Sequence, residues 1–111
     1  MNWLELSNES QLNELIKDSQ NSPVLIFKHS TRCSISSMAI NRLERAWKDE
    51  ANLKAYYLDL IKYRDISNLV ASKLGVEHQS PQAIIIKDGK AIYNNSHMAI
   101  AFDELEGAAK S

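Results

Sequence analysis

A single cysteine is the residue of this chain best suited to chemistry. Cys33 lies in the pentad Arg-Cys-Ser-Ile-Ser of residues 32–36, directly after an apolar stretch of strand length and directly before a stretch with helical periodicity. The N-terminus of a helix carries unpaired backbone N–H groups and a partial positive charge, and both favour a thiolate over a thiol. Since the thiolate is the nucleophile in disulfide exchange, this position predicts a reactive cysteine.

Basic residues surround the cysteine, although the chain as a whole has a net charge of -1. Between Pro23 and Lys48 the only acidic residue is Glu44, whereas the basic residues are Lys28, Arg32, Arg42, Arg45 and Lys48. We interpret the last three as the solvated face of a helix. Arg32 differs, because a cation beside a thiol stabilises the thiolate and attracts an anionic partner. The slightly acidic chain has no basic stripe with interleaved aromatic residues, which argues against nucleic-acid binding.

Length and composition are those of one globular domain spanning residues 1–111. The chain is 44% hydrophobic and 24% charged, and its 111 residues suffice to bury a core. No apolar stretch approaches the roughly 18 residues that a membrane helix needs, and the start of the chain, with Glu5 and Glu9, lacks the pattern of a secretory signal. A lone cysteine cannot form an internal disulfide, and proteins without disulfides are typical of the reducing cytosol. We therefore expect a cytoplasmic monomer that does not bind membranes.

The elements that must position Cys33 alternate between strands and helices. Short apolar or aromatic stretches predict strands at residues 3–6, 24–27, 55–60, 83–86 and 91–93, and helical periodicity predicts helices around residues 12–16, 35–47, 66–74 and 98–106. Gly75 is suited to end the third helix, and Asp88-Gly89 predicts a hairpin between the last two strands. Strands joined by crossover helices, followed by a hairpin, predict an α/β protein with a mixed sheet and helices on both faces.

Several other side chains receive structural interpretations. Those whose spacing predicts core packing are Met38 and Trp47 in the second helix, and Met98, Phe102 and Leu105 in the last. His29 follows a strand, where a histidine is more often structural than catalytic. His78 is interpreted as a loop residue. Asp59 lies inside the predicted strand of residues 55–60, and a carboxylate that meets solvent at the strand end is favoured over a buried proton relay.

This order of elements resembles the thioredoxin fold over nearly the whole chain. The features that carry the resemblance are Cys33 at the start of the second helix and Ser80-Pro81 directly before the fourth strand. The resemblance implies that Pro81 follows a cis peptide bond and that Ser80 and Pro81 align an incoming disulfide beside the sulfur. Thioredoxins use a Cys-x-x-Cys pair, but the second position here is Ser36, which cannot resolve a mixed disulfide. We expect its hydroxyl to donate a hydrogen bond to the Cys33 thiolate.

The stretch from Val24 to Ala39 is similar to the YtxJ-like family, the monothiol bacilliredoxins, whose motif reads Thr-Cys-Pro-Ile-Ser. The lead-in Phe-Lys-His-Ser at residues 27–30, the segment Ile-Ser-Ser at residues 35–37 and the later Ser-His at residues 96–97 all match. Arg32 stands in place of the threonine and Ser34 in place of the proline. The first change adds positive charge beside the thiol, and the second removes a rigid residue from the helix start. We expect both residues to contact the substrate.

The family resemblance implies a reaction on bacillithiol, a small thiol that carries a sugar and a malate group. The Cys33 thiolate would attack a protein–bacillithiol mixed disulfide, release the protein thiol and retain bacillithiol until a second thiol regenerates Cys33. Arg32 would attract the carboxylates of bacillithiol. The expected partners are bacillithiol and S-bacillithiolated client proteins, with no cofactor and no metal site.

Two other functions are compatible with a lone cysteine. The chain is alternatively a non-catalytic thioredoxin-fold adaptor or redox sensor, in which Cys33 is only S-thiolated. Monothiol glutaredoxins that share an iron–sulfur cluster are a second alternative. Those proteins use a Cys-Gly-Phe-Ser motif, which this sequence does not contain.

Overall fold

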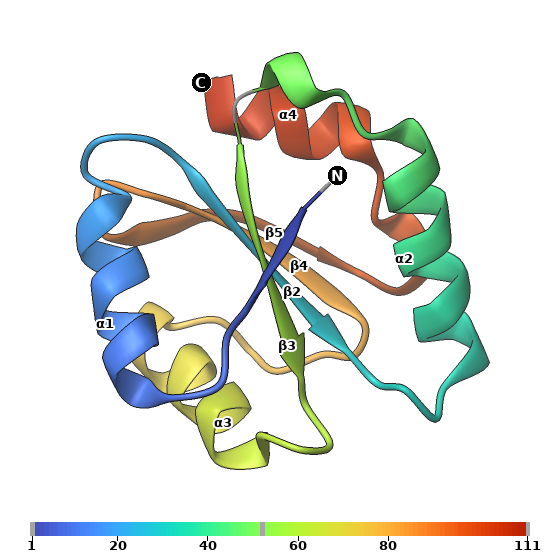
Figure 1. Cartoon of the computed structure of the whole chain (residues 1–111), viewed down its shortest axis with the longest axis horizontal. Helices are drawn as coiled ribbons and strands as arrows, with labels where there is room; N and C mark the ends of the chain where they lie inside the picture. The colour runs from blue at the N-terminus through green and yellow to red at the C-terminus, as the bar shows by residue number, and fades with distance from the viewer. Residues whose placement is uncertain (1, 52, 111) are drawn as a thin grey trace.

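Five strands form one mixed sheet in the order β1-β3-β2-β4-β5 (Figure 1). The computed structural model describes residues 2–51 and 53–110. The strands are β1 (Trp3–Glu5), β2 (Val24–His29), β3 (Lys54–Asp59), β4 (Gln82–Lys87) and β5 (Lys90–Ser96). β1, β3 and β2 run parallel, whereas β4 is antiparallel to β2 and β5 is antiparallel to β4. The mixed sheet expected from the sequence is therefore confirmed.

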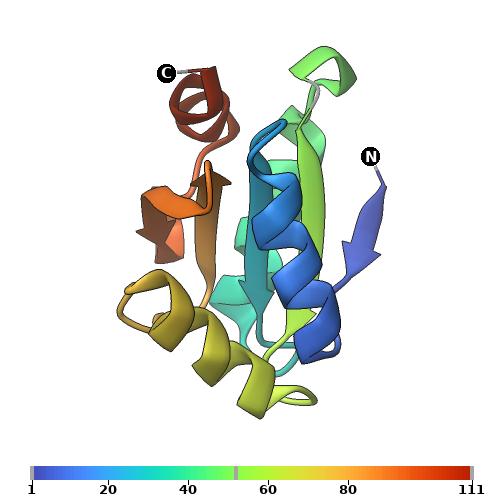
Figure 2. The same cartoon turned by 90° about the vertical axis from the view of Figure 1, so that its left-hand side faces the viewer.

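Helices cover both faces of this sheet, as Figure 2 shows. They are α1 (Glu9–Asp18), α2 (Ser34–Ala46), α3 (Arg64–Leu74) and α4 (Phe102–Lys110), with short 3-10 helices η1 (Asp49–Ala51) and η2 (His97–Ala99). α1 and α3 pack on one face, and α2 and α4 pack on the other. α1 joins the parallel strands β1 and β2, and α2 joins the parallel strands β2 and β3 in the opposite direction along the sheet, so right-handed crossovers place these two helices on opposite faces.

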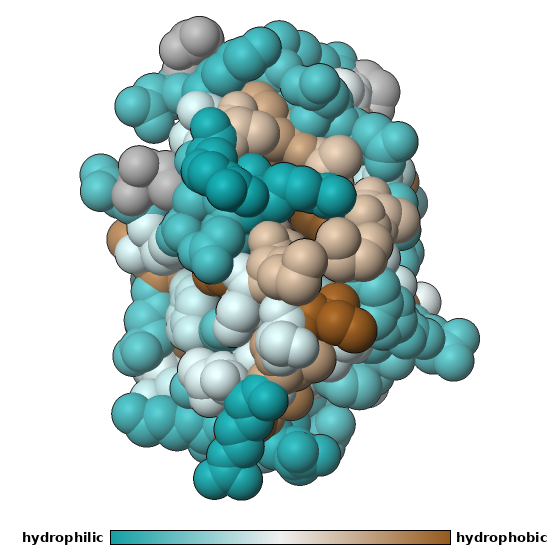
Figure 3. All heavy atoms as spheres, turned by 90° about the vertical axis from the view of Figure 1, so that its right-hand side faces the viewer, coloured by the Kyte–Doolittle hydropathy of each residue, from teal (hydrophilic) through white to brown (hydrophobic). Residues whose placement is uncertain are grey.

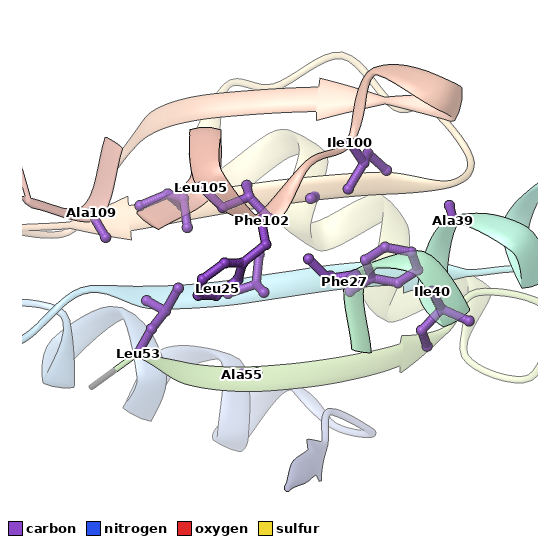
Figure 4. Packing of buried hydrophobic residues seen from close by; sticks show 13 residues of the cluster. Leu25, Phe27, Ala39, Ile40, Leu53, Ala55, Ile100, Phe102, Leu105 and Ala109 are labelled. Atoms are coloured by element: carbon purple, nitrogen blue, oxygen red, sulfur yellow. The ribbon is translucent and has the colours of Figure 1, made fainter. Parts of the chain in front are cut away.

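The central strand β2 supplies both layers of the core. Successive side chains of a strand point to opposite faces, so Leu25 and Phe27 join the cluster under α2 and α4, which Figure 4 shows from close by. Val24 and Ile26 join the cluster under α1 and α3. All six residues of β2 are buried, including the polar Lys28 and His29 at its end. The carboxyl end of β2 is thus a fixed, largely dry platform.

Local signals in the sequence account for several element ends. The Asn8 side chain accepts a hydrogen bond of 2.9 Å from the Gln11 N–H and caps α1. Gly75 ends α3 in the left-handed region at φ 65°, as expected for a C-terminal cap. Asp88 and Gly89 both have positive φ in the turn between β4 and β5, which confirms the predicted hairpin.

Two predictions of core packing are wrong. Met38 is 56% exposed and Met98 is 47% exposed. Met98 lies in the 3-10 helix η2 and not in the last α-helix, because α4 begins only at Phe102. Helical periodicity around residues 35–47 leaves the exact buried face open by one residue, and Ala39, Ile40 and Leu43 occupy it instead of Met38. Phe102 and Leu105 are buried as expected.

Candidate functional site

Cys33 lies where β2 passes into α2. It is the N-cap residue of that helix, has an extended backbone (φ -109°, ψ 121°) and is half-buried. Its N–H donates to the Ser30 carbonyl at 3.1 Å, and its carbonyl accepts from the Ser37 N–H at 3.1 Å. The predicted position at a helix N-terminus is confirmed. The thiol therefore lies at the positive end of the helix dipole, within reach of solvent.

Ser36 closes the loop that carries the cysteine. Its side chain is fully buried, and its Oγ accepts a hydrogen bond of 3.0 Å from the Ser30 N–H and lies 2.7 Å from Nδ1 of His29. Within residues 2–51 and 53–110, no hydrogen bond joins this Oγ to the Cys33 sulfur. The hydroxyl expected to reach the thiolate is instead engaged in holding the Ser30–Ser36 loop together.

His29 is the partner of this hydroxyl. The imidazole is 7% exposed and packs against the rings of Phe27 and Tyr57, with centroid distances of 6.2 and 5.4 Å. Burial lowers the pKa of His29 below its ordinary value of 6.5, against the opposing charges of Asp59 and Glu44. His29 is therefore neutral at pH 7. Its structural role agrees with the interpretation of the sequence, although its contact with Ser36 carried no sequence signal.

Ser80 and Pro81 reach the same end of the sheet as Cys33. Gln82 pairs with Lys28 in the antiparallel ladder, so Pro81 lies level with the end of β2. The Ser80–Pro81 peptide bond is cis, as the thioredoxin resemblance implies. The Pro81 carbonyl accepts a hydrogen bond of 3.0 Å from the His97 N–H. The Ser-His segment of residues 96–97 therefore borders the loop that ends at Pro81.

The basic residues near Cys33 have different surroundings. Arg32 and Ser34 are exposed on either side of the cysteine, where both are open to a bound molecule. Arg42 donates through Nη2 to the carbonyls of Met98 and Ile100, and it thereby joins α2 to the segment around η2. Lys28 is fully buried. Of the basic residues expected around the thiol, Arg32 is therefore the main one that places its charge on the surface next to Cys33.

The face that α2 presents to solvent is partly apolar. Figure 3 shows apolar atoms bordered by hydrophilic ones on this side of the molecule. Among the exposed large apolar side chains are Ile35, Met38 and Met98. The first two belong to the opening turns of α2, directly after Cys33, so the half-buried thiol adjoins a surface that water wets poorly.

Among the described residues, the best-formed cleft lies away from Cys33. A cleft of about 400 Å³ is lined by residues such as Ser22, Trp47 and Lys54, which lie at the amino ends of the parallel strands, opposite Cys33. Within the described ranges, no three His, Cys, Asp or Glu side chains are grouped so that they could hold a metal ion. No described helix has both the length and the apolar character needed to cross a membrane.

Solved structures with the same fold are similar to nearly the whole chain. A protein described as a candidate oxidoreductase with a thioredoxin fold is 32% identical, has a TM-score of 0.82 and matches over 95% of this chain and 91% of its own. Mitochondrial thioredoxin 3 of Saccharomyces cerevisiae is 22% identical, with a TM-score of 0.72 over 97% and 93% of the two chains. Thioredoxin of Malassezia sympodialis is 16% identical, with a TM-score of 0.74 over 98% and 89%.

A family model connects this fold to thiol chemistry. The model of the monothiol bacilliredoxin BrxC matches residues 4–105, a range that contains Cys33, Pro81 and every strand of the sheet but the first residue of β1. The thioredoxin fold expected from the sequence is confirmed, and the family and the fold together support a thiol redox function. The chain belongs to the monothiol bacilliredoxin family.

Proposed function

We propose that this chain removes bacillithiol from S-bacillithiolated proteins by thiol–disulfide exchange at Cys33. The observation that carries the proposal is a half-buried thiol at the N-cap of α2, in a chain with no second cysteine. A lone thiol can accept a small thiol but cannot expel it with a neighbour of its own. The membership of the monothiol bacilliredoxin family supports bacillithiol as that small thiol.

The exchange conserves the number of disulfide bonds. The Cys33 thiolate attacks the bacillithiol sulfur of the mixed disulfide, the bond to the client sulfur breaks, and the client leaves as a thiolate that takes up a proton from water. Cys33 then holds bacillithiol in a mixed disulfide. A thiol of a second molecule attacks this disulfide, takes bacillithiol and returns Cys33 to the thiolate. Each step is a substitution at sulfur with no net oxidation.

The residues around Cys33 have distinct roles in this proposal. The exposed guanidinium of Arg32 pairs with carboxylates of bacillithiol, and the exposed Ser34 hydroxyl offers a further hydrogen bond beside the sulfur. Ser80 and Pro81 align the incoming disulfide through their backbone. Ser36 acts indirectly, since its hydroxyl holds the loop of Cys33 through Ser30 and His29. The apolar surface of Ile35, Met38 and Met98 suits a protein client.

Mass spectrometry tests the small-thiol half of the proposal. Incubation with oxidised bacillithiol is expected to add one bacillithiol to Cys33 faster than oxidised glutathione adds glutathione. The Cys33→Ser variant controls for addition elsewhere and is expected to stay unmodified. An absent adduct, or one formed no faster than with oxidised glutathione, would contradict bacillithiol as the substrate.

Release kinetics separate an exchange enzyme from an adaptor or sensor. The unmodified chain is expected to accelerate the loss of bacillithiol from an S-bacillithiolated client protein, and Cys33→Ser is expected to leave the spontaneous rate unchanged. If bacillithiol adds to Cys33 but release from the client stays at the spontaneous rate, the chain is a target of S-thiolation and the enzymatic proposal is wrong.

A further inference from the structure

A lysine is fully buried on the central strand, and the reaction above makes no use of it. The Lys28 side chain is 0% exposed and lies between Leu58 and Gln82 of the neighbouring strands. Its Nζ donates to the Ser67 carbonyl of α3 at 3.1 Å and lies 3.1 Å from Nδ1 of His78. No carboxylate forms an ion pair with it in the part of the chain that the structure describes. Because a buried ammonium without a counter-ion costs free energy, packing alone does not account for this lysine.

The contacts of Lys28 lead to the loop before β4, which comprises residues 75–81 and ends at the cis peptide bond. Gln82, the partner of Lys28 in the ladder, is fully buried as well. Its Nε2 donates to the Glu77 carbonyl at 3.0 Å, and its Oε1 accepts from the Gln79 N–H at 3.4 Å. Lys28 contacts His78, and Gln82 bonds to Glu77 and Gln79. Two buried side chains therefore fix three successive residues of the loop.

We propose that Lys28 is a positioning residue of the site, which fixes the loop of residues 75–81 through His78 and so sets the backbone of Ser80 and Pro81 against an incoming disulfide. The inference rests on the proposed function, because it assumes that disulfides dock on this loop. Lys28 itself touches neither the substrate nor Cys33. It acts from the opposite face of β2, where α3 covers it.

The contact between Lys28 and His78 depends on the protonation state of both side chains. Burial lowers the pKa of Lys28 to about 8, and burial together with the charges of Lys28 and Arg64 lowers the pKa of His78. At pH 7 a charged Lys28 therefore donates to a neutral His78. Arg64 of α3 is the other charge near the pair, while the ladder partners Leu58 and Gln82 carry none. Protonation of His78 places two cations 3.1 Å apart and breaks the contact.

Two rates measured on the full chain separate positioning from thiol reactivity. Alkylation of Cys33 by iodoacetamide reports the thiol alone, whereas exchange with a mixed disulfide also needs the loop. Exchange is measured with one cysteine peptide linked either to bacillithiol or to glutathione. Lys28→Met is expected to slow exchange with both disulfides at least fivefold and to leave alkylation unchanged. Lys17→Met, which removes an exposed lysine of α1, is the matched control and is expected to behave as the unmodified chain.

The outcomes distinguish this inference from the proposed function. If the unmodified chain exchanges only with the glutathione peptide and Lys28→Met still slows it, bacillithiol is the wrong substrate and the positioning role stands. If Lys28→Met exchanges as fast as the unmodified chain, the positioning role is wrong. Slower alkylation in Lys28→Met, together with a lower urea midpoint at pH 7, would also overturn it, because the defect would then be general.

His78→Gln provides an independent test at an exposed position. If Lys28 acts through His78, the double variant is expected to be no slower than either single variant, and an additive double variant would overturn the inference. In the unmodified chain, the ratio of exchange rate to alkylation rate is expected to fall as the pH drops below 6.5, the ordinary pKa of histidine. The same ratio is expected to stay level in His78→Gln. A level ratio in the unmodified chain would contradict the role of His78.

Discussion

At the scale of single residues, the Ser36 hydroxyl shows how a short loop keeps a half-buried thiol in place. It accepts a hydrogen bond from the Ser30 N–H and pairs with Nδ1 of His29. Both of these polar groups would otherwise be buried without a hydrogen-bond partner. Buried polar groups that are fully satisfied rigidify their surroundings. The loop of Cys33 is therefore held to β2 by a side chain, in addition to the backbone bond from Cys33 to Ser30.

Removing that hydroxyl is expected to destabilise the chain. Ser36→Ala leaves the Ser30 N–H and His29 Nδ1 without this partner, and an unsatisfied buried group costs about 1–3 kcal/mol. Urea unfolding followed by circular dichroism measures the loss. Ser34→Ala, at an exposed position in the same helical turn, is the control and is expected to stay within about 0.5 kcal/mol of the unmodified chain. Equal stability of the two variants would show that the hydroxyl is not a structural link.

Residue type alone predicted part of this arrangement. A serine three positions after Cys33 cannot resolve a mixed disulfide, and that follows from its chemistry without coordinates. The partners of its hydroxyl do not follow, because they depend on how the loop between β2 and α2 closes. The same is true of Lys28, since the sequence places a lysine after an apolar strand but does not reveal that α3 covers it.

At the scale of elements, Gly75 determines where α3 ends and where the loop toward Pro81 begins. Its φ of 65° lies in the left-handed region, where a side chain costs about 1–2 kcal/mol. No atom lies within 4 Å of the position that a Cβ would take, so the cost comes from the backbone and not from a clash. The direction of the loop therefore depends on a glycine at this position.

Two glycine-to-alanine variants test this dependence. Gly75→Ala is expected to lower the free energy of unfolding by about 1 kcal/mol. Gly107→Ala, in the helical interior of α4 with no atom within 4 Å of the added Cβ, is expected to raise it by about 0.5–1 kcal/mol. Thermal unfolding at one pH compares them. Changes of the same sign would mean that the backbone conformation of Gly75 does not govern the effect.

The elements were predictable where the periodicity was strong and their ends carried a signal. Gly75 and the Asp88-Gly89 turn are such signals, and both lie where expected. The start of the last helix carried none. His97 adopts a φ of 57° and Arg42 binds the Met98 carbonyl, so the chain forms η2 before α4 begins. A long-range contact of this kind overrides local periodicity.

At the scale of the whole molecule, the buried side chains of Lys28 and His29 have lowered pKa values, and both make the stability of the fold depend on pH. The unfolded chain binds more protons than the folded chain wherever a folded pKa is depressed, so stability rises with pH there. The stability contributed by neutral His29 is fully present above 6.5 and is lost as the pH falls through its lowered pKa. For Lys28, the rise in stability occurs between the folded pKa of about 8 and the ordinary pKa of 10.5.

The contribution of Lys28 is measurable by urea unfolding at pH 7 and pH 10. The unmodified chain is expected to gain about 2 kcal/mol more over this interval than Lys28→Met, because only the unmodified chain loses a buried charge as the pH rises. Lys17→Met is expected to show the full gain, since its lysine is exposed. An identical gain in Lys28→Met would indicate that the buried amine is already neutral at pH 7.

The sheet architecture was the most predictable part of the molecule. Alternating strands and helices, followed by a hairpin, leave few topologies open, and the thioredoxin arrangement is one of them. Two features of the candidate site lie where they were expected: Cys33 at the start of α2, which the residue pattern predicted, and the cis bond before Pro81, which the thioredoxin resemblance implied. The buried polar groups that hold its loops were not, because their partners are up to 50 residues distant in sequence.

The alternation of β2 has a consequence for insertions and deletions. Lys28 and His29 point to opposite faces, one toward His78 and one toward Ser36, so a single added residue within β2 ahead of Lys28 would exchange their faces. Both loops of the site would then lose their attachment at once. An added residue in the exposed turn around Asn21 and Ser22 leaves that phase unchanged. The chain is therefore expected to tolerate length variation before β2 and to lose exchange activity when it occurs within the strand.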